Sequence, residues 1–228
     1  MSVFASLVEQ LAELLQPLFA SSATAAAIVL FTALVRLALL PLSRAAARGQ
    51  RARVRLAPEL AALREKHGKN PERLQKEVLA LHSREKVSPL AGCLPSLLQL
   101  PAFFLLFQLF SGDLMDGHSL LAAPLGGTWA GALGDGGPFG AAGLVYAGLF
   151  AVVAAVATYT YLRGRRDSVA APGLPPALAG ALPLLSYGTL LTVAVVPLAA
   201  ALYVVTSTLW TAVERTVLYP SPAAATAR

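Results

Sequence analysis

The feature that most constrains this chain is a series of apolar runs, each about twenty residues long, which is roughly the length of α-helix that crosses a bilayer core about 30 Å thick. The runs are continuous, unlike the alternating strands of an outer-membrane barrel. Hydrophobic residues make up 56% of the chain and charged residues 13%. Soluble domains carry about 25% charged residues. The five runs occupy residues 23–42, 89–111, 142–162, 174–192 and 194–213.

These runs predict an all-α, polytopic membrane protein with five transmembrane helices. Pro183 interrupts the fourth run, and only a few residues around Pro197 separate it from the fifth. We therefore expect the last two helices to form a tight hairpin. The single cysteine, Cys93, cannot form an intramolecular disulfide, so helix packing must supply the stability.

Basic residues are concentrated on one side of this arrangement. Residues 43–88 contain twelve of the eighteen Lys and Arg residues, and three arginines follow the third run, whereas residues 112–141 contain none. Short cytoplasmic loops are enriched in Lys and Arg. We therefore expect a multi-pass protein of the plasma membrane, with both basic connections in the cytoplasm, the N-terminus outside and the C-terminus in the cytoplasm.

The first twenty residues predict an amphipathic helix that lies in the outer membrane interface. Glu9 and Glu13 stand where a cleavable signal would carry its basic residues, so a signal peptide is not expected. The alternative is an extra turn or two of the first span. Apolar residues recur at helical spacing, as expected for an interfacial helix: Phe4, Leu7, Val8, Leu11, Leu14, Leu15 and Leu18.

The basic segment 44–88 predicts a cytoplasmic helical hairpin. Gly68 suits the end of one helix, while Asn70 suits the N-cap and Pro71 the first position of the next. The alternative is a solvated charged loop that only anchors topology. Each arm carries an apolar stripe that can pack on the other: Leu56, Leu60 and Leu63 on the first, and Leu74, Val78 and Leu81 on the second.

The predicted boundaries are therefore an interfacial helix (1–20), a first transmembrane helix (21–43), the hairpin (44–88), the remaining four-helix part of the core (89–213) and a short cytoplasmic tail (214–228).

Arg36 is the one charged residue inside the five runs, about 5 Å to the cytoplasmic side of the centre of its span. An arginine at such a depth costs roughly 2.5–3.5 kcal/mol on insertion scales and stays protonated. One interpretation is that its long side chain reaches the inner headgroups. The other is a water-filled cavity between helices, lined by polar side chains.

Candidate lining residues lie on three of the runs. Because no run contains an acidic residue, we expect water or a negative group of another polypeptide to stabilise Arg36. Ser and Thr in membrane helices often bond their own backbone, so each assignment is weak by itself. The candidates are Thr32 and Ser43 on the first helix, Gly92, Ser96 and Gln99 on the second, and Tyr203, Thr206, Ser207 and Trp210 on the fifth.

Residues 88–107 read SPLAGCLPSLLQLPAFFLLF and resemble the signature of the YidC/Oxa/Alb insertase family, in a short form of the kind found in actinobacteria or Gram-positive bacteria. The order of segments around the signature is also similar. The fifth run departs from the family pattern at Ala199, Val204 and Thr208. The matching residues are Pro89, Gly92, Cys93, Pro95, Gln99, Pro101 and Phe103, together with Pro197 in the fifth run.

The resemblance implies a five-helix core with a hydrophilic groove, closed to the outside and open to cytoplasm and lipid, in which Arg36 is the charge and Gln99 a polar wall residue. The implied function is a membrane protein insertase or chaperone. Its partners would be nascent membrane proteins and the lipid bilayer, with the general translocon and the ribosome as further candidates. The basic hairpin fits anionic headgroups, ribosomal surfaces or an acidic nascent chain, and we expect no nucleic-acid sequence recognition.

Two other function classes fit the sequence less well. A small channel or transporter subunit with Arg36 as an anion site is the alternative, although the five unlike runs show no inverted repeat. An intramembrane enzyme is not expected, because His67, His82 and His118 lie outside the runs and no nucleophile shares their depth. We expect no metal ion or cofactor, since no cluster has ligand spacing.

Overall fold

The computed structural model describes residues 2–68, 70–85, 104, 108, 117–169 and 182–218. This part of the chain is α-helical apart from short 3₁₀ segments and one two-stranded antiparallel sheet, so the all-α class is confirmed. The predicted second span lies outside the described residues, except that Phe104 and Gln108 are helical. The signature residues Pro89, Gly92, Cys93, Pro95, Pro101 and Phe103 lie outside them as well.

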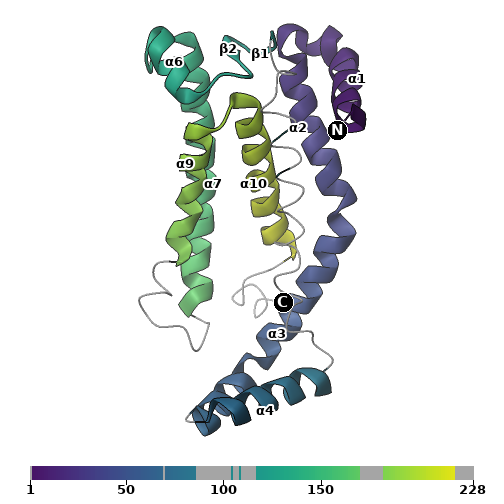
Figure 1. Ribbon diagram of the computed structural model, residues 1–228, viewed down its shortest axis with the longest axis vertical. Coiled ribbons are helices and arrows are strands. Elements are labelled where there is room, and N and C mark those ends of the chain that lie inside the picture. The colour runs from purple at the N-terminus through teal and green to yellow at the C-terminus, as the bar shows by residue number, and fades with distance from the viewer. Residues whose placement is uncertain are drawn as a thin grey trace.

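The described elements follow one another in the order shown in Figure 1. They are α1 (Ser2–Phe19), η1 (Ala20–Ser22), α2 (Ala23–Ala38), α3 (Leu40–His67), α4 (Pro71–Arg84), β1 (Ser119–Leu120), β2 (Ala123–Pro124), α6 (Trp129–Gly136), α7 (Ala141–Val169), η3 (Leu182–Tyr187), α9 (Gly188–Val195) and α10 (Leu198–Leu218).

Helices α2 and α3 follow each other as one nearly continuous helix. Backbone hydrogen bonds from Leu39 N to Val35 O and from Ser43 N to Leu39 O continue the helical pattern across the junction. Pro41 falls in the first turn of α3, where its missing N–H is not needed. The first predicted span therefore passes directly into the basic arm, and α3 begins three residues before the expected boundary at 43.

The bundle consists of α2, α7, α9 and α10, with α10 in the middle (Figure 1). The N-terminal half of α10 is buried from Leu198 to Val205. Its first free N–H groups are satisfied from another segment, because Leu198 N donates to Gly127 O at 2.8 Å and Ala199 N to Leu125 O at 2.9 Å. The connection between β2 and α6 thus caps α10.

The α9–α10 connection is short, because α9 ends at Val195 and α10 begins at Leu198. The expected turn around Pro197 is therefore present, with the two helices side by side. The fourth predicted span differs from a regular helix in its described part. Residues Leu182–Tyr187, which include Pro183, form a 3₁₀ segment before α9 begins.

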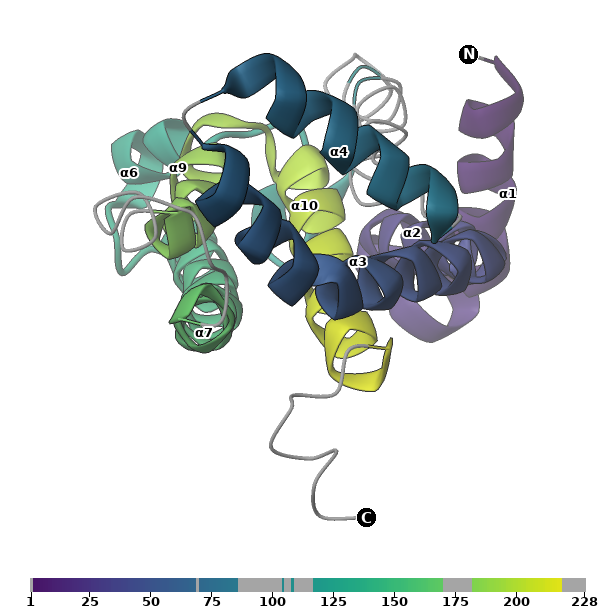
Figure 2. The ribbon, with the colours of Figure 1, turned by 90° about the horizontal axis from the view of Figure 1, so that it is seen from below.

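Helix α1 packs one face on α2 through Val8, which is buried, and the half-buried Leu11 and Leu15. Another face leaves Leu14 and Leu18 exposed, at 76% and 77%. Figures 1 and 2 together show α1 slanting away from the axis of α2 rather than following it. This arrangement fits a helix in the membrane interface, which stays a prediction.

Helices α3 and α4 extend below the bundle, and α3 crosses beneath it (Figure 2). The Asn70 side chain accepts a hydrogen bond from Arg73 N at 3.0 Å, and Pro71 begins α4. Arg84 of α4 forms a 3.0 Å ion pair with Glu59 of α3. The apolar stripe residues of both arms are buried or half-buried: Leu56, Leu60, Leu63, Leu74, Val78 and Leu81.

Gly68 follows the last residue of α3, as the sequence suggests. Its φ is −58°, so this glycine is not in the left-handed region. A Cβ at this position would lie 2.6 Å from Arg64 O. The close approach of the backbone is therefore the reason for a glycine here.

Two helical stretches in the described part are long and apolar enough to cross a membrane. They are Ser6–Ala38, which comprises most of α1 and all of α2, and Ala141–Arg165 within α7. Pro183–Val195 is a shorter apolar helix. The count of five transmembrane helices stays a prediction.

Candidate functional site

Arg36 lies in the last turn of α2 and is half-buried against α10. Its Nε donates to Ser207 Oγ at 3.2 Å, and its Nη2 donates to the same oxygen. Ser207 is only 6% exposed. The long apolar runs of α2 and α10 pack side by side, and this packing brings together two residues 171 positions apart.

Ser207 provides hydrogen bonding to Arg36 but no charge. The guanidinium carries five N–H donors, and a hydroxyl oxygen has two lone pairs. Both lone pairs are used if Nε and Nη2 bond to Ser207 together. A neutral oxygen also leaves the positive charge of Arg36 without compensation, so this contact meets only part of what a buried guanidinium needs.

Thr32 and Tyr203, two of the predicted groove residues, differ in their relation to Arg36. Thr32 is 2% exposed, but its hydroxyl donates to Ile28 O at 2.7 Å, so it serves its own helix rather than Arg36. Tyr203 is 3% exposed and lies within electrostatic reach of Arg36. Ser96 and Gln99, the candidates on the second span, lie outside the described residues. The structure thus joins the predicted residues Arg36 and Ser207 and places Tyr203 near them.

Glu214 is a candidate that the sequence reasoning missed. The apolar pattern of the sequence predicts a tail from residue 214 onward, but α10 continues to Leu218. Its Oε1 is buried and has no hydrogen-bond partner among the described residues. Glu214 is also within electrostatic reach of Arg36. The available signal was its spacing, seven residues after Ser207 and therefore on the same helix face.

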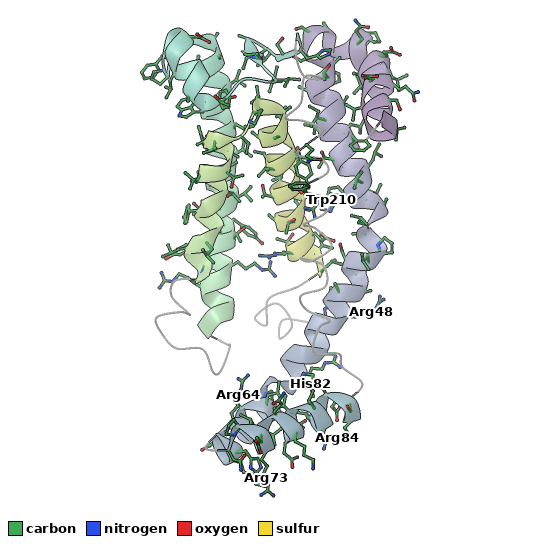
Figure 3. All side chains as sticks on the ribbon, viewed as in Figure 1. Arg48, Arg64, Arg73, His82, Arg84 and Trp210 are labelled. Atoms are coloured by element: carbon green, nitrogen blue, oxygen red, sulfur yellow. The ribbon has the colours of Figure 1, made fainter. Side chains whose placement is uncertain are left out.

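The lower end of α10 is joined to α3 by a second arginine. The Arg51 guanidinium donates to the carbonyl oxygen of Leu218, the last residue of α10. Helix C-termini carry unpaired carbonyls and a partial negative charge, so a cation is favourable there. In Figure 3, Trp210 projects from α10 toward α2.

Basic side chains gather at the end of the molecule where α3 and α4 lie. Figure 3 shows Arg48 along α3, Arg64 and Arg73 near the junction of α3 with α4, and Arg84 at the other end of α4. The opposite end holds β1, β2 and α6 (Figure 1). A hydrogen bond of 3.0 Å between Thr24 Oγ1 and His118 Nδ1 ties that end to α2. The two ends thus differ strongly in charge.

The described residues offer no arrangement for metal chemistry. None of their His, Cys, Asp and Glu side chains form a group of three or more that could hold a metal ion. His82 Nδ1 is 2.8 Å from Val78 O within α4, and His118 contacts Thr24 at the other end. Cys93 lies outside the described residues.

Comparison with known families settles the class of protein. The sequence model of a family described as 60Kd inner membrane protein matches residues 15–223. The chain belongs to that family. It is the YidC/Oxa family of membrane proteins, an insertase family rather than an enzyme family, which confirms the resemblance seen in the sequence.

Relatives within the YidC/Oxa family match shorter parts of the chain. The membrane protein insertase YidC of Clostridium perfringens is 42% identical over 104 residues, which are 45% of this chain and 43% of that protein. The insertase of Maridesulfovibrio salexigens is 40% identical over 93 residues, and that of Azotobacter vinelandii 40% identical over 80. These cover 41% and 35% of this chain, and 17% and 14% of the relatives. The matched stretches thus span less than half of each relative.

Proposed function

We propose that this chain is a membrane protein insertase, which helps hydrophobic segments and their short polar flanks enter the bilayer. The contact of Arg36 with Ser207 carries the proposal, because among the described residues a hydroxyl is the one hydrogen-bond partner of this guanidinium between apolar helices. A polar flank that passes through the membrane needs a polar group of this kind to bind it there. The names of the YidC relatives support the same function.

The exposed surfaces of the bundle support contact with lipid. Large apolar side chains are exposed on α2 (Leu30, Leu34 and Leu37), on α7 (Leu144, Val152 and Leu162) and on α10 (Leu209, Val213 and Val217). In water such patches would favour aggregation, whereas hydrocarbon chains solvate them. An incoming helix that leaves the Arg36 site would find lipid beside it.

The proposed groove is lined by Arg36, Ser207 and Tyr203. Ser96 and Gln99, the candidates that the sequence adds, lie outside the described residues. Thr32 supports the fold of α2 at this level instead of lining the groove. The groove opens toward the basic end of the molecule. That end lies in the cytoplasm, with α3 and α4 available to meet a nascent chain, a ribosomal surface or the translocon.

Replacement of Arg36 tests the proposal. In reconstituted vesicles, Arg36→Ala should slow the insertion of substrates with acidic translocated flanks by about tenfold, which matches the loss of one charge-assisted hydrogen bond. Substrates with neutral flanks should be less affected. Arg36→Lys keeps the charge and should retain most of the activity.

Arg48→Ala is the matched control, because Arg48 is an exposed arginine of α3. It should leave the ratio between acidic and neutral substrates unchanged. Equal insertion of both substrate classes by Arg36→Ala would contradict the proposed role. Solute flux through vesicles that hold this protein alone would favour the channel alternative.

A further inference from the structure

Glu214 is a half-buried acid that the proposed insertion mechanism leaves unused. Its carboxylate oxygen Oε1 is buried and has no hydrogen-bond partner among the described residues. No Lys or Arg among those residues lies within ion-pair distance of it. A buried carboxylate oxygen without a donor is costly, and a nearby positive charge offsets part of that cost.

Arg36 is in the complementary position. Its described hydrogen bonds go to Ser207, which has no charge. Ser207 and Glu214 lie on one face of α10, about 10 Å apart along the helix axis. Thr211 is on the same face between them, and its hydroxyl donates to Ser207 O at 2.9 Å. The two opposite charges thus lie along one side of α10, with no ion pair between them among the described residues.

We propose that Glu214 is the internal counter-charge of Arg36 and sets the charge preference of the site for the flank that is being translocated. This inference rests on the proposed insertase function. The carboxylate offsets part of the positive potential at Arg36 while the site is empty. It also repels acidic flanks and attracts basic ones, so the site tolerates a wider range of flanks than a lone arginine would.

The local electrostatic potential can be measured without any insertion assay. The Thr211→Cys change, in a Cys93→Ser background, places a thiol on the face of α10 that lies between Ser207 and Glu214, where its reactivity reports the local potential. Full-length protein in membrane vesicles is treated with an anionic and a cationic thiosulfonate reagent of similar size, and the two modification rates are compared. The ratio of the anionic to the cationic rate reports the potential at position 211.

The Glu214→Gln change should raise this ratio by about tenfold, the order expected when one unit charge is removed at close range in a partly hydrated site. Arg36→Gln should lower it by a similar factor. Glu77→Gln, which neutralises an exposed acid of α4, should leave it unchanged. In the insertion assay, Glu214→Gln should favour acidic over basic flanks relative to the parent protein.

The outcomes separate this inference from the proposed function. A ratio that is the same with Glu and Gln at position 214 would overturn the counter-charge role of Glu214 and leave Arg36 as the only charge of the site. A cysteine at position 211 that reacts with neither reagent would contradict the hydrated groove itself, and with it both proposals. A changed rate ratio without a changed substrate preference would overturn the specificity role.

Discussion

At the scale of single residues, placing Arg36 among apolar helices costs free energy, and the described contacts offset only part of that cost. An arginine in the apolar core costs roughly 2.5–3.5 kcal/mol on insertion scales, and a hydrogen bond to a charged group returns about 1.5–3 kcal/mol. Ser207 offers one oxygen to two N–H donors. The described residues give the remaining donors no hydrogen-bond partner, and the proposed hydrated groove predicts water at these donors.

Ser207→Ala tests whether water is present. In a hydrated site, water replaces the lost hydroxyl, and the free energy of unfolding should fall by less than about 1 kcal/mol. In a dry site, the loss should reach about 3 kcal/mol, because a buried charge is left without an acceptor. Denaturant titration of the purified protein in detergent measures the difference.

Ser207→Thr keeps the hydroxyl and serves as the control for side-chain volume. A loss of about 3 kcal/mol in the alanine variant alone would contradict a water-filled groove around Arg36.

At the scale of elements, α4 shows how local sequence determines a helix boundary. Asn70 caps the first turn, Pro71 needs no N–H partner there, and Glu72 is favourable near the positive end of the helix. Each effect is local, which is why these residues identify the boundary in the sequence. The contact of α4 with α3 adds the exposed Arg84–Glu59 pair, and such surface pairs contribute little stability.

Asn70→Ala should therefore loosen the first turn of α4 without unfolding the bundle. Loss of an N-cap costs about 1 kcal/mol. Hydrogen exchange at the amide of Arg73, which donates to the Asn70 side chain, should become about fivefold faster. Asn70→Asp keeps the acceptor and should exchange at close to the original rate. Unchanged exchange in the alanine variant would show that the cap contributes nothing.

At the scale of the whole molecule, charge distinguishes the two ends of the bundle. Arg48, Arg64 and Arg73 lie with α3 and α4 at one end, while β1, β2 and α6 occupy the other (Figures 1 and 3). Because short basic segments remain in the cytoplasm, this asymmetry predicts the orientation of the protein in the membrane.

Single cysteines in a Cys93→Ser background can test this orientation. A cysteine at Leu121, which is 73% exposed, should react with a membrane-impermeant maleimide added outside intact cells. A cysteine at Ala80, exposed on α4, should react only after the cells are opened. Labelling of both positions from the same side would contradict the proposed topology.

Much of this protein can be read from its sequence, because membrane helices follow local rules. The length and apolarity of the runs indicate the predicted membrane spans, and the basic residues indicate the cytoplasmic side. Gly68, Asn70 and Pro71 mark the junction between α3 and α4. Arg36 also stands out, since an ionised group inside an apolar run has few structural explanations. These signals depend on residues close together in the chain.

Tertiary structure decides which partners surround Arg36. Pairing α2 with α10 brings Ser207 to the guanidinium across 171 positions, while the equally plausible Thr32 bonds its own helix. The continuation of α10 to Leu218 turns Glu214 from a tail residue into a neighbour of the site. Composition cannot show either result, because the pairing and relative rotation of helices depend on packing over the whole bundle.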